Sequence, residues 1–423
     1  MADSVLAAVV EKYQQYLNPG QAKLLDFMGF GVIEERSAGC YVWDSDGNQY
    51  LDFLGGFGVF SLGHNPPEVA AAVHEQLGRM PMSSRLMMSR QQAELAELLA
   101  QITPGELRYS FFCNSGAEAV EGALKLVRLW FAEQGRPRGR IVSTLEAFHG
   151  KTLGALSVSG RRKYRQPFEP LLTGIAHVPY GDAEALAAAV DDQTAAVILE
   201  PVQGEAGAVT PPDGYLAAAR AACDAHGAKL IFDEVQTGFG RTGYLFGCQH
   251  EDVAPDVMTL AKALGGGVMP LGAFIATPEL WQPLVANPLL HTSTWGGNPL
   301  ACAAGLAAVK SIIAQDLASK ARERGEQVLT GARRLQAQFP DMIKAVRGRG
   351  LLVGVEFFDE DIGGLVIAKL AMRRLLVAYA LNSPSTIRLE PPLIVTAEQC
   401  HQALAWLAEA LAETRELVAM LAE

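Results

Sequence analysis

The chain has 423 residues, a formal net charge of −11 at pH 7 and a hydrophobic fraction of 49%. A chain of this length is expected to form two or three lobes around a large buried core, as in an ordinary soluble globular enzyme. The acidic balance disfavours nucleic acids and anionic membranes as partners.

The cysteines point to a reducing compartment. None stands in a C-x-x-C pair, so we expect neither a zinc site nor a disulfide framework, and no other metal is indicated. Reduced thiols favour a cytoplasmic protein. The N-terminal apolar run at 5–10 is too short for a signal peptide, and no stretch of about 18 apolar residues predicts a membrane span. The six cysteines are Cys40, Cys113, Cys223, Cys248, Cys302 and Cys400.

The first sixty residues contain the turn signal Asp44-Ser45-Asp46-Gly47, which predicts a hairpin. From residue 61 onward, short apolar runs alternate with stretches rich in alanine and leucine. The runs predict buried strands at Tyr109–Cys113, Ala196–Leu199, Leu230–Phe232 and Ala273–Ala276. The stretches between them predict helices at Ala117–Trp130, Ala183–Val190 and Gly214–His226.

This alternation predicts an α/β fold with a mainly parallel central sheet. In such sheets the ligand lies beyond the carboxyl ends of the strands. The last hundred residues differ and predict a smaller α+β lobe. Its expected elements are a helix near Ala321–Phe339, strands at Leu351–Phe357, Leu375–Leu381 and Thr386–Leu389, and a closing helix from Ala397. We therefore divide the chain into an N-terminal part of the small domain (1–60), a large domain (61–320) and a C-terminal part of the small domain (321–423).

Asp233 stands where the apolar strand at 230–232 ends. A carboxylate there is costly without a partner. A pyridinium nitrogen would be such a partner, because a neighbouring aspartate keeps the ring protonated and able to accept electrons. The alternative is an acidic residue that caps the next helix, and this position alone does not decide between the two.

Lys262 follows an apolar segment and precedes three glycines at 265–267. An amine that forms a Schiff base with pyridoxal phosphate (PLP) must come from a lysine, and glycines leave room for backbone beside a bulky ligand. The alternative is a surface lysine ahead of a flexible turn, which is the commoner fate of a single lysine.

Two further motifs suit the same ligand. A strand runs into Asn114-Ser115-Gly116-Ala117 and a helix begins, so its free N–H groups can bind a phosphate. Ser115 or Asn114 as a simple helix cap is the alternative. Phe148 offers a ring face that can stack on a planar cofactor, although an aromatic core residue explains it equally well.

Together the motifs resemble the class III (ornithine-type) aminotransferases of PLP fold type I, over nearly the whole chain. Each motif is weak alone, but their order is highly specific. The motifs are Gly63-His64, NSGAEA at 114–119, AFHG at 147–150, EPVQGE at 200–205, DEVQTGFGRTG at 233–243, AKALGGG at 261–267, HTSTWGGNPL at 291–300 and TIRLEPPLI at 386–394. The implied fold is a large domain with a mainly parallel sheet and a smaller α+β domain.

The resemblance also implies the cofactor and a role for each site residue. Lys262 holds PLP as a Schiff base and shuttles the proton, and Asp233 pairs with the pyridine nitrogen. The other cofactor contacts come from Ser115, Gly116 and Ala117 at the phosphate, Phe148 on the ring, Gln236 near the ring oxygen O3′ and Thr294 of the neighbouring subunit at the phosphate.

Two further residues, Glu205 and Arg388, are implied to form a switchable pair in which the freed Arg388 grips a substrate carboxylate. The implied active unit is a homodimer, or a dimer of dimers, with shared sites. Its partners are an amine and a 2-oxo acid.

Within the class, the apolar segment at 54–60 and the sequence IRLEPPL at 387–393 look closest to putrescine (diamine) aminotransferases. The expected reaction moves a terminal amino group from a diamine to a 2-oxo acid such as 2-oxoglutarate. Trp295 and Ser83-Ser84-Arg85 depart from the family pattern and have no assigned effect.

Three alternatives remain open. Ornithine or N-acetylornithine fits Arg388 as well as a diamine does. A PLP epimerase or decarboxylase on the same fold would need no 2-oxo acid. A non-catalytic binding protein would have no need of both Lys262 and Asp233.

Overall fold

The computed structural model describes residues 2–422, and its centre is a seven-stranded sheet with the order β4-β10-β9-β8-β7-β5-β6. The strands are β4 (Tyr109–Cys113), β5 (Arg140–Thr144), β6 (Ile175–Val178), β7 (Thr194–Leu199), β8 (Lys229–Asp233), β9 (Val257–Leu260) and β10 (Gly272–Ala276). Within this sheet β10 runs antiparallel to both of its neighbours, and the other neighbouring strands pair in parallel. The predicted α/β class with a mainly parallel sheet is confirmed.

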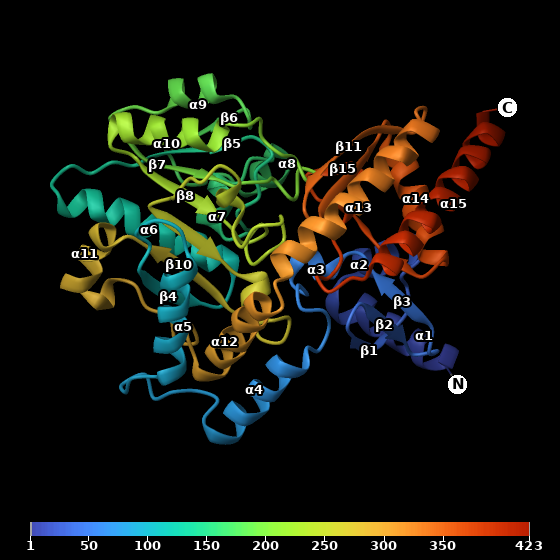
Figure 1. Ribbon diagram of the computed structural model, residues 1–423, viewed down its shortest axis with the longest axis horizontal. Helices are drawn as coiled ribbons and strands as arrows, with labels where there is room; N and C mark the ends of the chain where they lie inside the picture. Colours follow the sequence, from blue (N-terminus) through green and yellow to red (C-terminus); the bar gives the residue numbers. More distant parts are fainter. Residues whose placement is uncertain (1, 423) are drawn as a thin grey trace.

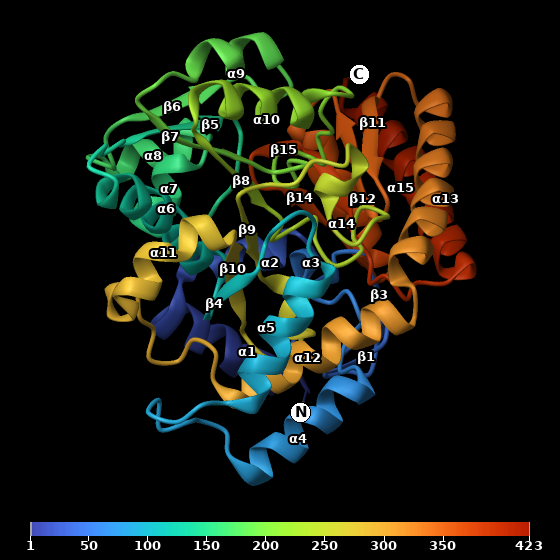
Figure 2. The same ribbon diagram turned by 60° about the vertical axis from the view of Figure 1, so that its left-hand side comes forward.

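Helices cover both faces of this sheet (Figures 1 and 2). Successive side chains of a strand point to opposite faces, so Ile231 of β8 joins one hydrophobic layer while Leu230 and Phe232 join the other. Burial on both sides explains why the central strands are continuous apolar runs. The covering helices are α6 (Gly116–Glu133), α7 (Leu153–Val158) and α11 (Pro278–Ala286) on one face, and α9 (Ala183–Ala189) and α10 (Tyr215–His226) on the other.

A group of helices extends from the lower part of the large domain in Figure 1. There α12 packs against α4 and α5 and against the turn that follows β9. Among the described residues no single helix is long and apolar enough to cross a membrane, although α12 and α13, bent by 63°, pass that test as a pair. The helices of this group are α4 (Pro67–Arg79), α5 (Arg90–Ile102) and α12 (Pro299–Ala314), whereas α13 (Leu317–Gln338) follows α12 and lies against the C-terminal sheet.

The N-terminal residues form two helices and a small sheet. The predicted hairpin is confirmed, because β2 and β3 pair antiparallel and Asp44 accepts hydrogen bonds from Asp46 and Asn48 in the turn. The fourth strand of this sheet, β13, comes from the far end of the chain and pairs in parallel with β3. The elements are α1 (Ala2–Lys12), α2 (Pro19–Phe27), β1 (Glu34–Ala38), β2 (Tyr41–Asp44), β3 (Gln49–Asp52) and β13 (Leu375–Leu376).

The C-terminal residues form a second four-stranded sheet with α13, α14 and α15 (right of Figure 1). The expected single strand at Leu375–Leu381 is wrong. The chain pairs with β3 at 375–376, then changes sheets and pairs antiparallel with β15 at 378–380. The domain boundaries at residues 60 and 320 stay predictions. The elements are β11 (Ile343–Arg349), β12 (Leu352–Phe357), α14 (Glu360–Met372), β14 (Ala378–Ala380), β15 (Ser383–Leu389) and α15 (Ala397–Ala422).

Candidate active site

The carboxyl ends of four parallel strands meet at one edge of the central sheet. Beyond this edge lies a cavity of about 550 Å³. Ser115 follows β4, Glu200 follows β7, Asp233 ends β8 and Lys262 follows β9, and all four line the cavity. This is the edge at which open parallel sheets bind their ligands.

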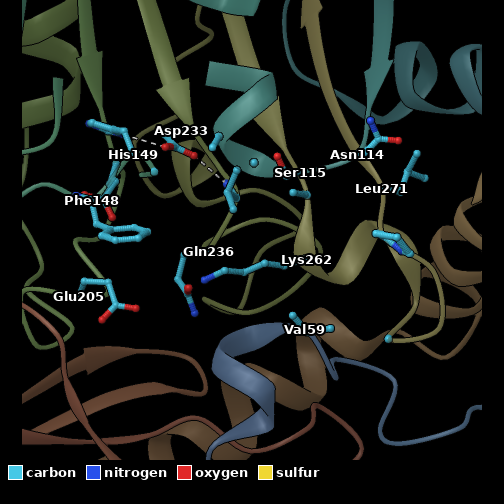
Figure 3. Close-up of a pocket in the computed structure, with 18 of the residues that line it drawn as sticks. Val59, Asn114, Ser115, Phe148, His149, Glu205, Asp233, Gln236, Lys262 and Leu271 are labelled. Carbon is cyan, nitrogen blue, oxygen red and sulfur yellow. Dashed lines mark hydrogen bonds and ion pairs between the residues drawn. The ribbon is translucent and has the colours of Figure 1, made fainter. Parts of the chain in front are cut away.

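Asp233 is held in place by three neighbours at the back of the cavity (Figure 3). Its Oδ1 accepts hydrogen bonds from the backbone N–H of Val235 at 3.1 Å and from Oγ1 of Thr259 at 3.0 Å. Its Oδ2 lies 2.7 Å from Nδ1 of His149. Burial opposes a charge on His149, but the hydrogen bond and charge of Asp233 raise its pKa overall. The pair presents a fixed carboxylate to whatever cation enters.

Lys262 begins a short 3-10 turn (η4, Lys262–Gly265) just after β9. Its backbone φ of +48° lies in the left-handed region, which is costly for a residue with a Cβ and often marks a functional position. Burial lowers the pKa of the amine, although the charges of Glu390 and Glu205 oppose this shift. A lowered pKa increases the share of neutral amine, which is the form that attacks a carbonyl carbon.

The N-terminus of α6 forms another wall of the cavity. The Ser115 side chain caps the helix by accepting a hydrogen bond from the N–H of Glu118 at 3.2 Å. The first N–H groups, including those of Gly116 and Ala117, have no acceptor within the helix. A Cβ on Gly116 would lie 3.0 Å from a methyl group of Val235, so the helix closely approaches the turn that follows β8. The free N–H groups suit a phosphate.

Phe148 and Gln236 both line the cavity, and the Lys262 side chain reaches toward Gln236 (Figure 3). The N–H of Phe148 donates a hydrogen bond to Glu200 Oε2 at 3.0 Å. Burial, together with the nearby charge of Asp233, raises the pKa of Glu200 to about 8 although His149 opposes the shift. Glu200 therefore keeps its proton at neutral pH.

The structure brings Glu205 and Arg388 together. Their Oε1 and Nη2 atoms are 3.1 Å apart. Glu205 lines the cavity, whereas Arg388 is fully buried behind it and its guanidinium carbon lies 5.4 Å from the ring centre of Phe57. The other oxygen of Glu205 accepts a hydrogen bond from the N–H of Leu381 at 2.9 Å. The carboxylate covers the guanidinium on its cavity side.

Thr294 is not brought to the cavity of its own chain. It is exposed on a loop beside Trp295, whose exposed fraction is 62%. Arg85 fixes this loop, because its guanidinium donates hydrogen bonds to the carbonyl oxygens of Gly296 at 2.8 Å and Ser293 at 2.7 Å. The two hydrogen bonds thus give Arg85 of the unassigned segment Ser83-Ser84-Arg85 a structural role. The contact of Thr294 with a neighbouring subunit stays a prediction.

Three residues of the site were not predicted. His149 and Glu200 lie within the quoted motifs AFHG and EPVQGE, so their positions could have indicated them. Glu390 lies in the motif TIRLEPPLI and directly follows β15, so its position at a strand end was visible in the sequence, but its contact with Gln236 forms only in the folded chain. Among residues 2–422, no group of three or more His, Cys, Asp or Glu side chains is arranged to hold a metal ion.

The residues present fit PLP. The cofactor needs an amine, a counter-ion for its ring nitrogen, a phosphate site and space for a flat ring. The cavity supplies the buried amine of Lys262, the carboxylate of Asp233 and the open N-terminus of α6, and Phe148 bounds the space between them. The fold and the site thus define an α/β enzyme of the PLP-binding type.

The comparisons with known proteins agree. The profile described as "Aminotransferase class-III" matches residues 28–411. Two structures of ornithine aminotransferase from Toxoplasma gondii are each 33% identical and cover 91% of both chains, with TM-scores of 0.87 and 0.86. The second reports partial occupancy of PLP at its active site.

An (S)-enantioselective omega-transaminase from Thermomicrobium roseum is 32% identical over 98% of this chain and 99% of its own, with a TM-score of 0.89. Acetylornithine aminotransferase from Elizabethkingia anophelis is 32% identical over 90% and 94% of the two chains, with a TM-score of 0.79. The chain therefore belongs to the class III aminotransferase family. It is a PLP-dependent enzyme, and aminotransferases act on an amine and a 2-oxo acid.

Proposed function

We propose that this aminotransferase moves a terminal amino group from a putrescine-like diamine to a 2-oxo acid such as 2-oxoglutarate. The observation that carries the proposal is the pair formed by Glu205 and Arg388. In the closed pair, a donor without a carboxylate meets an acidic side chain at the cavity wall. When Glu205 moves aside, a 2-oxo acid meets the guanidinium instead. Val59, Val268 and Met269 add an apolar lining that suits a methylene chain.

The proposed roles follow from the chemistry of each side chain. When bound, PLP supplies an aldehyde that condenses with primary amines and a ring that accepts electrons from the substrate carbon. Lys262 Nζ holds the cofactor and then carries a proton from the substrate carbon. Asp233, fixed by His149, holds the proton on the ring nitrogen. The N–H groups of Gly116 and Ala117, with the Ser115 hydroxyl, bind the phosphate.

Phe148 and Gln236 are proposed to orient the ring of the cofactor. Phe148 would stack on one face, which an aromatic ring does at van der Waals distance. Gln236 would donate a hydrogen bond to the ring oxygen O3′ from its remaining amide N–H. Both residues line the cavity, which supports these roles.

Ornithine or N-acetylornithine as the donor is the second candidate. It is favoured by the similarity to ornithine and acetylornithine aminotransferases at 33% and 32% identity. A panel of amines with 2-oxoglutarate as the acceptor separates the candidates. We expect putrescine and its neighbours in chain length to give the highest kcat/KM. A preference for ornithine or N-acetylornithine, with no turnover of putrescine, would remove the diamine proposal.

Arg388→Ala should damage the two half-reactions unequally. Loss of a charge-assisted bidentate contact should cost the oxo acid about 2–5 kcal/mol, or roughly 30-fold to several-thousand-fold in binding. A diamine does not use that contact and should lose little. Single-turnover kinetics of each half-reaction, followed by the absorbance of the cofactor, measure the split. Equal losses in both halves would rule out the switch.

We also propose a homodimer, or a dimer of dimers, as the active unit. Support comes from apolar side chains that are exposed on the loop at 86–88 and from the exposed Thr294–Trp295 loop nearby. Sedimentation of the holoenzyme measures the state, and a monomer with full activity would contradict it. A cytoplasmic location remains a prediction from the six buried thiols, and cell fractionation is its test.

A further inference from the structure

Four charged side chains gather beside the cavity, on the side away from Asp233. Glu205 lines the cavity, and Arg388, Arg241 and Glu390 lie behind it with exposed fractions of 0–1%. Two arginines and two glutamates give this cluster a formal charge of zero. Buried charges persist only when they are paired, so each member depends on the others.

Glu390 is the carboxylate of the cluster that does not border the cavity. Its Oε1 accepts a hydrogen bond from Gln236 Nε2 and lies 3.7 Å from Nε of Arg241. Its Oε2 lies 3.8 Å from Nη1 of Arg388 and has no hydrogen-bond partner. A Cβ on Gly58 would lie 2.6 Å from both Gln236 Nε2 and Glu390 Oε1, so only glycine lets the N-terminal segment close over the carboxylate.

Arg388 thus stands between two carboxylates of different kinds. Glu205 borders the cavity and can give way to the carboxylate of a substrate. Glu390 does not line the cavity, so it stays beside Arg388 whichever substrate is bound. Its field also reaches the reactive amine, since it is the strongest charge that opposes the lowering of the pKa of Lys262.

We propose that Glu390 is a specificity-determining residue, which weakens the hold of Arg388 on carboxylates and so favours a donor that carries only positive charge. The inference rests on the proposed function, in which the donor is a diamine and Arg388 binds the oxo acid. A fixed negative charge beside the guanidinium repels any carboxylate that approaches it and attracts an ammonium. Glu390 acts through Arg388 and Gln236 and does not touch the substrate.

Glu390→Gln tests the proposal, because it removes the charge and keeps an oxygen that accepts a hydrogen bond from Gln236. Glutarate, a dicarboxylate without a reactive carbonyl group, probes Arg388 by calorimetry on the holoenzyme. We expect its Kd to fall about tenfold, which is about 1.4 kcal/mol. We expect the KM of putrescine to rise by a similar factor. A loss of structure alone would weaken both ligands, so the opposite signs identify an effect of charge.

Arg241 provides the matched controls. The double variant Arg241→Gln/Glu390→Gln restores the charge balance and should return the Kd of glutarate to within about threefold of the wild type. Arg241→Gln alone should weaken glutarate and leave the KM of putrescine unchanged or lower. This single variant tests the proposal without Glu390→Gln, should the latter fail to fold.

The outcomes separate this inference from the proposed function. Unchanged or weaker glutarate binding by a folded Glu390→Gln protein would overturn the role of Glu390. The role would also be overturned if Arg241→Gln weakened the binding of glutarate and of putrescine alike. Neither result touches the diamine proposal. If the wild type does not turn over putrescine, the diamine proposal fails and the glutarate measurements still decide whether Glu390 restrains Arg388.

Discussion

Two buried carboxyl groups lie a short distance apart in the site and are held in different ways. Asp233 receives hydrogen bonds from Val235 and Thr259 and pairs with His149. Glu200 receives one hydrogen bond, from Phe148, and burial keeps it protonated. Two carboxyl groups whose environments differ in this manner often have different roles in a site. In the proposed mechanism Asp233 is the counter-ion of the cofactor ring, and Glu200 holds the backbone of Phe148, which is proposed to stack on that ring.

The proton on Glu200 should make stability depend on pH. Unfolded, the group ionises near its ordinary value of 4.5, and folded it keeps its proton until about pH 8. Between these values the folded state holds the extra proton, so stability falls as the pH rises, by at most about 1.4 kcal/mol per pH unit. Glutamine does not titrate, so Glu200→Gln should not lose this stability as the pH rises. We therefore expect the difference between its melting temperature and that of the wild type to rise steadily from about pH 4.5 to about pH 8.

Glu356→Gln is the control for this prediction. Burial opposes the charge of Glu356, but hydrogen bonds from Lys344 and Arg347 lower its pKa overall. The stabilisation that Glu356 contributes is complete above its ordinary pKa of 4.5. It is lost only as the pH falls through the lower pKa that Glu356 has in the folded protein. The difference from the wild type should therefore be constant between about pH 4.5 and 8. A constant difference for Glu200→Gln as well would show that Glu200 is ionised in the folded protein.

The residues of the site differ in how well the sequence predicts their position and role. Asp233 ends an apolar strand and Lys262 follows an apolar segment, so the sequence indicated both positions, but only the family resemblance decided between a functional and a structural role for each. Arg388 and Glu205 were paired only through the family resemblance, because nearly two hundred residues separate them. Glu390 stands in a quoted motif, but its role was not predicted, because Arg241 and Gln236, which explain a buried acid there, meet it only in the folded chain.

Among the elements, the start of α6 meets the turn after β8 at the wall of the cavity. Gly116 lies against Val235, whose N–H donates to Asp233. A larger residue at 116 would push Val235 and thereby disturb the carboxylate. The start of α6, which is proposed to bind the phosphate, and Asp233, which is proposed as the ring counter-ion, are thus linked through Val235.

Gly116→Ala should weaken PLP binding several-fold without unfolding the protein. The added Cβ would meet Val235 at 3.0 Å, so Val235, in the turn after β8, must give way by a few tenths of an ångström. Equilibrium titration of the apoenzyme with PLP measures the effect. Gly364→Ala in α14 is the control, because its Cβ meets nothing within 4 Å and alanine favours a helix by about 1 kcal/mol. Equal PLP affinities for the two variants would contradict the close-contact argument.

The sequence predicted element types better than their pairing. β4 and the buried core of β7 and β8 follow from apolar runs, and α6 and α10 from helical spacing. The antiparallel direction of β10 was not predictable, because direction depends on the route of the chain between strands. The change of sheet between β13 and β14 was missed for a related reason, since Leu375–Ala380 is one apolar run whose two halves have different partners.

At the scale of the whole molecule, each active site is proposed to use two chains, with Thr294 supplied by the partner. Co-expression of Lys262→Ala with Thr294→Ala tests this. Each homodimer should be defective, by loss of the amine or by about tenfold weaker PLP binding, as expected for one hydrogen bond to a charged group. The mixed dimer should contain one intact site, with about half of the wild-type activity and wild-type PLP affinity.

Thr292→Ala is the control for this experiment, because Thr292 is exposed two residues away on the same loop. Its homodimer should match the wild type. If Thr294 acted within its own chain, no intact site would form in the mixed dimer, and its remaining activity would show the weak PLP binding of the Thr294→Ala homodimer.

The parallel pairing of β3 with β13 has a consequence for the timing of synthesis. Leu51 pairs with Leu375, so the strand that completes the N-terminal sheet is made about 320 residues after the strand it joins. At roughly 5–20 residues per second, the first three strands wait on the order of 15–65 s with one edge open. During that interval the nascent chain exposes an unpaired strand edge, which favours aggregation or binding by chaperones. The N-terminal sheet therefore cannot be completed until most of the chain has been made, although its first three strands are made before any part of the central sheet.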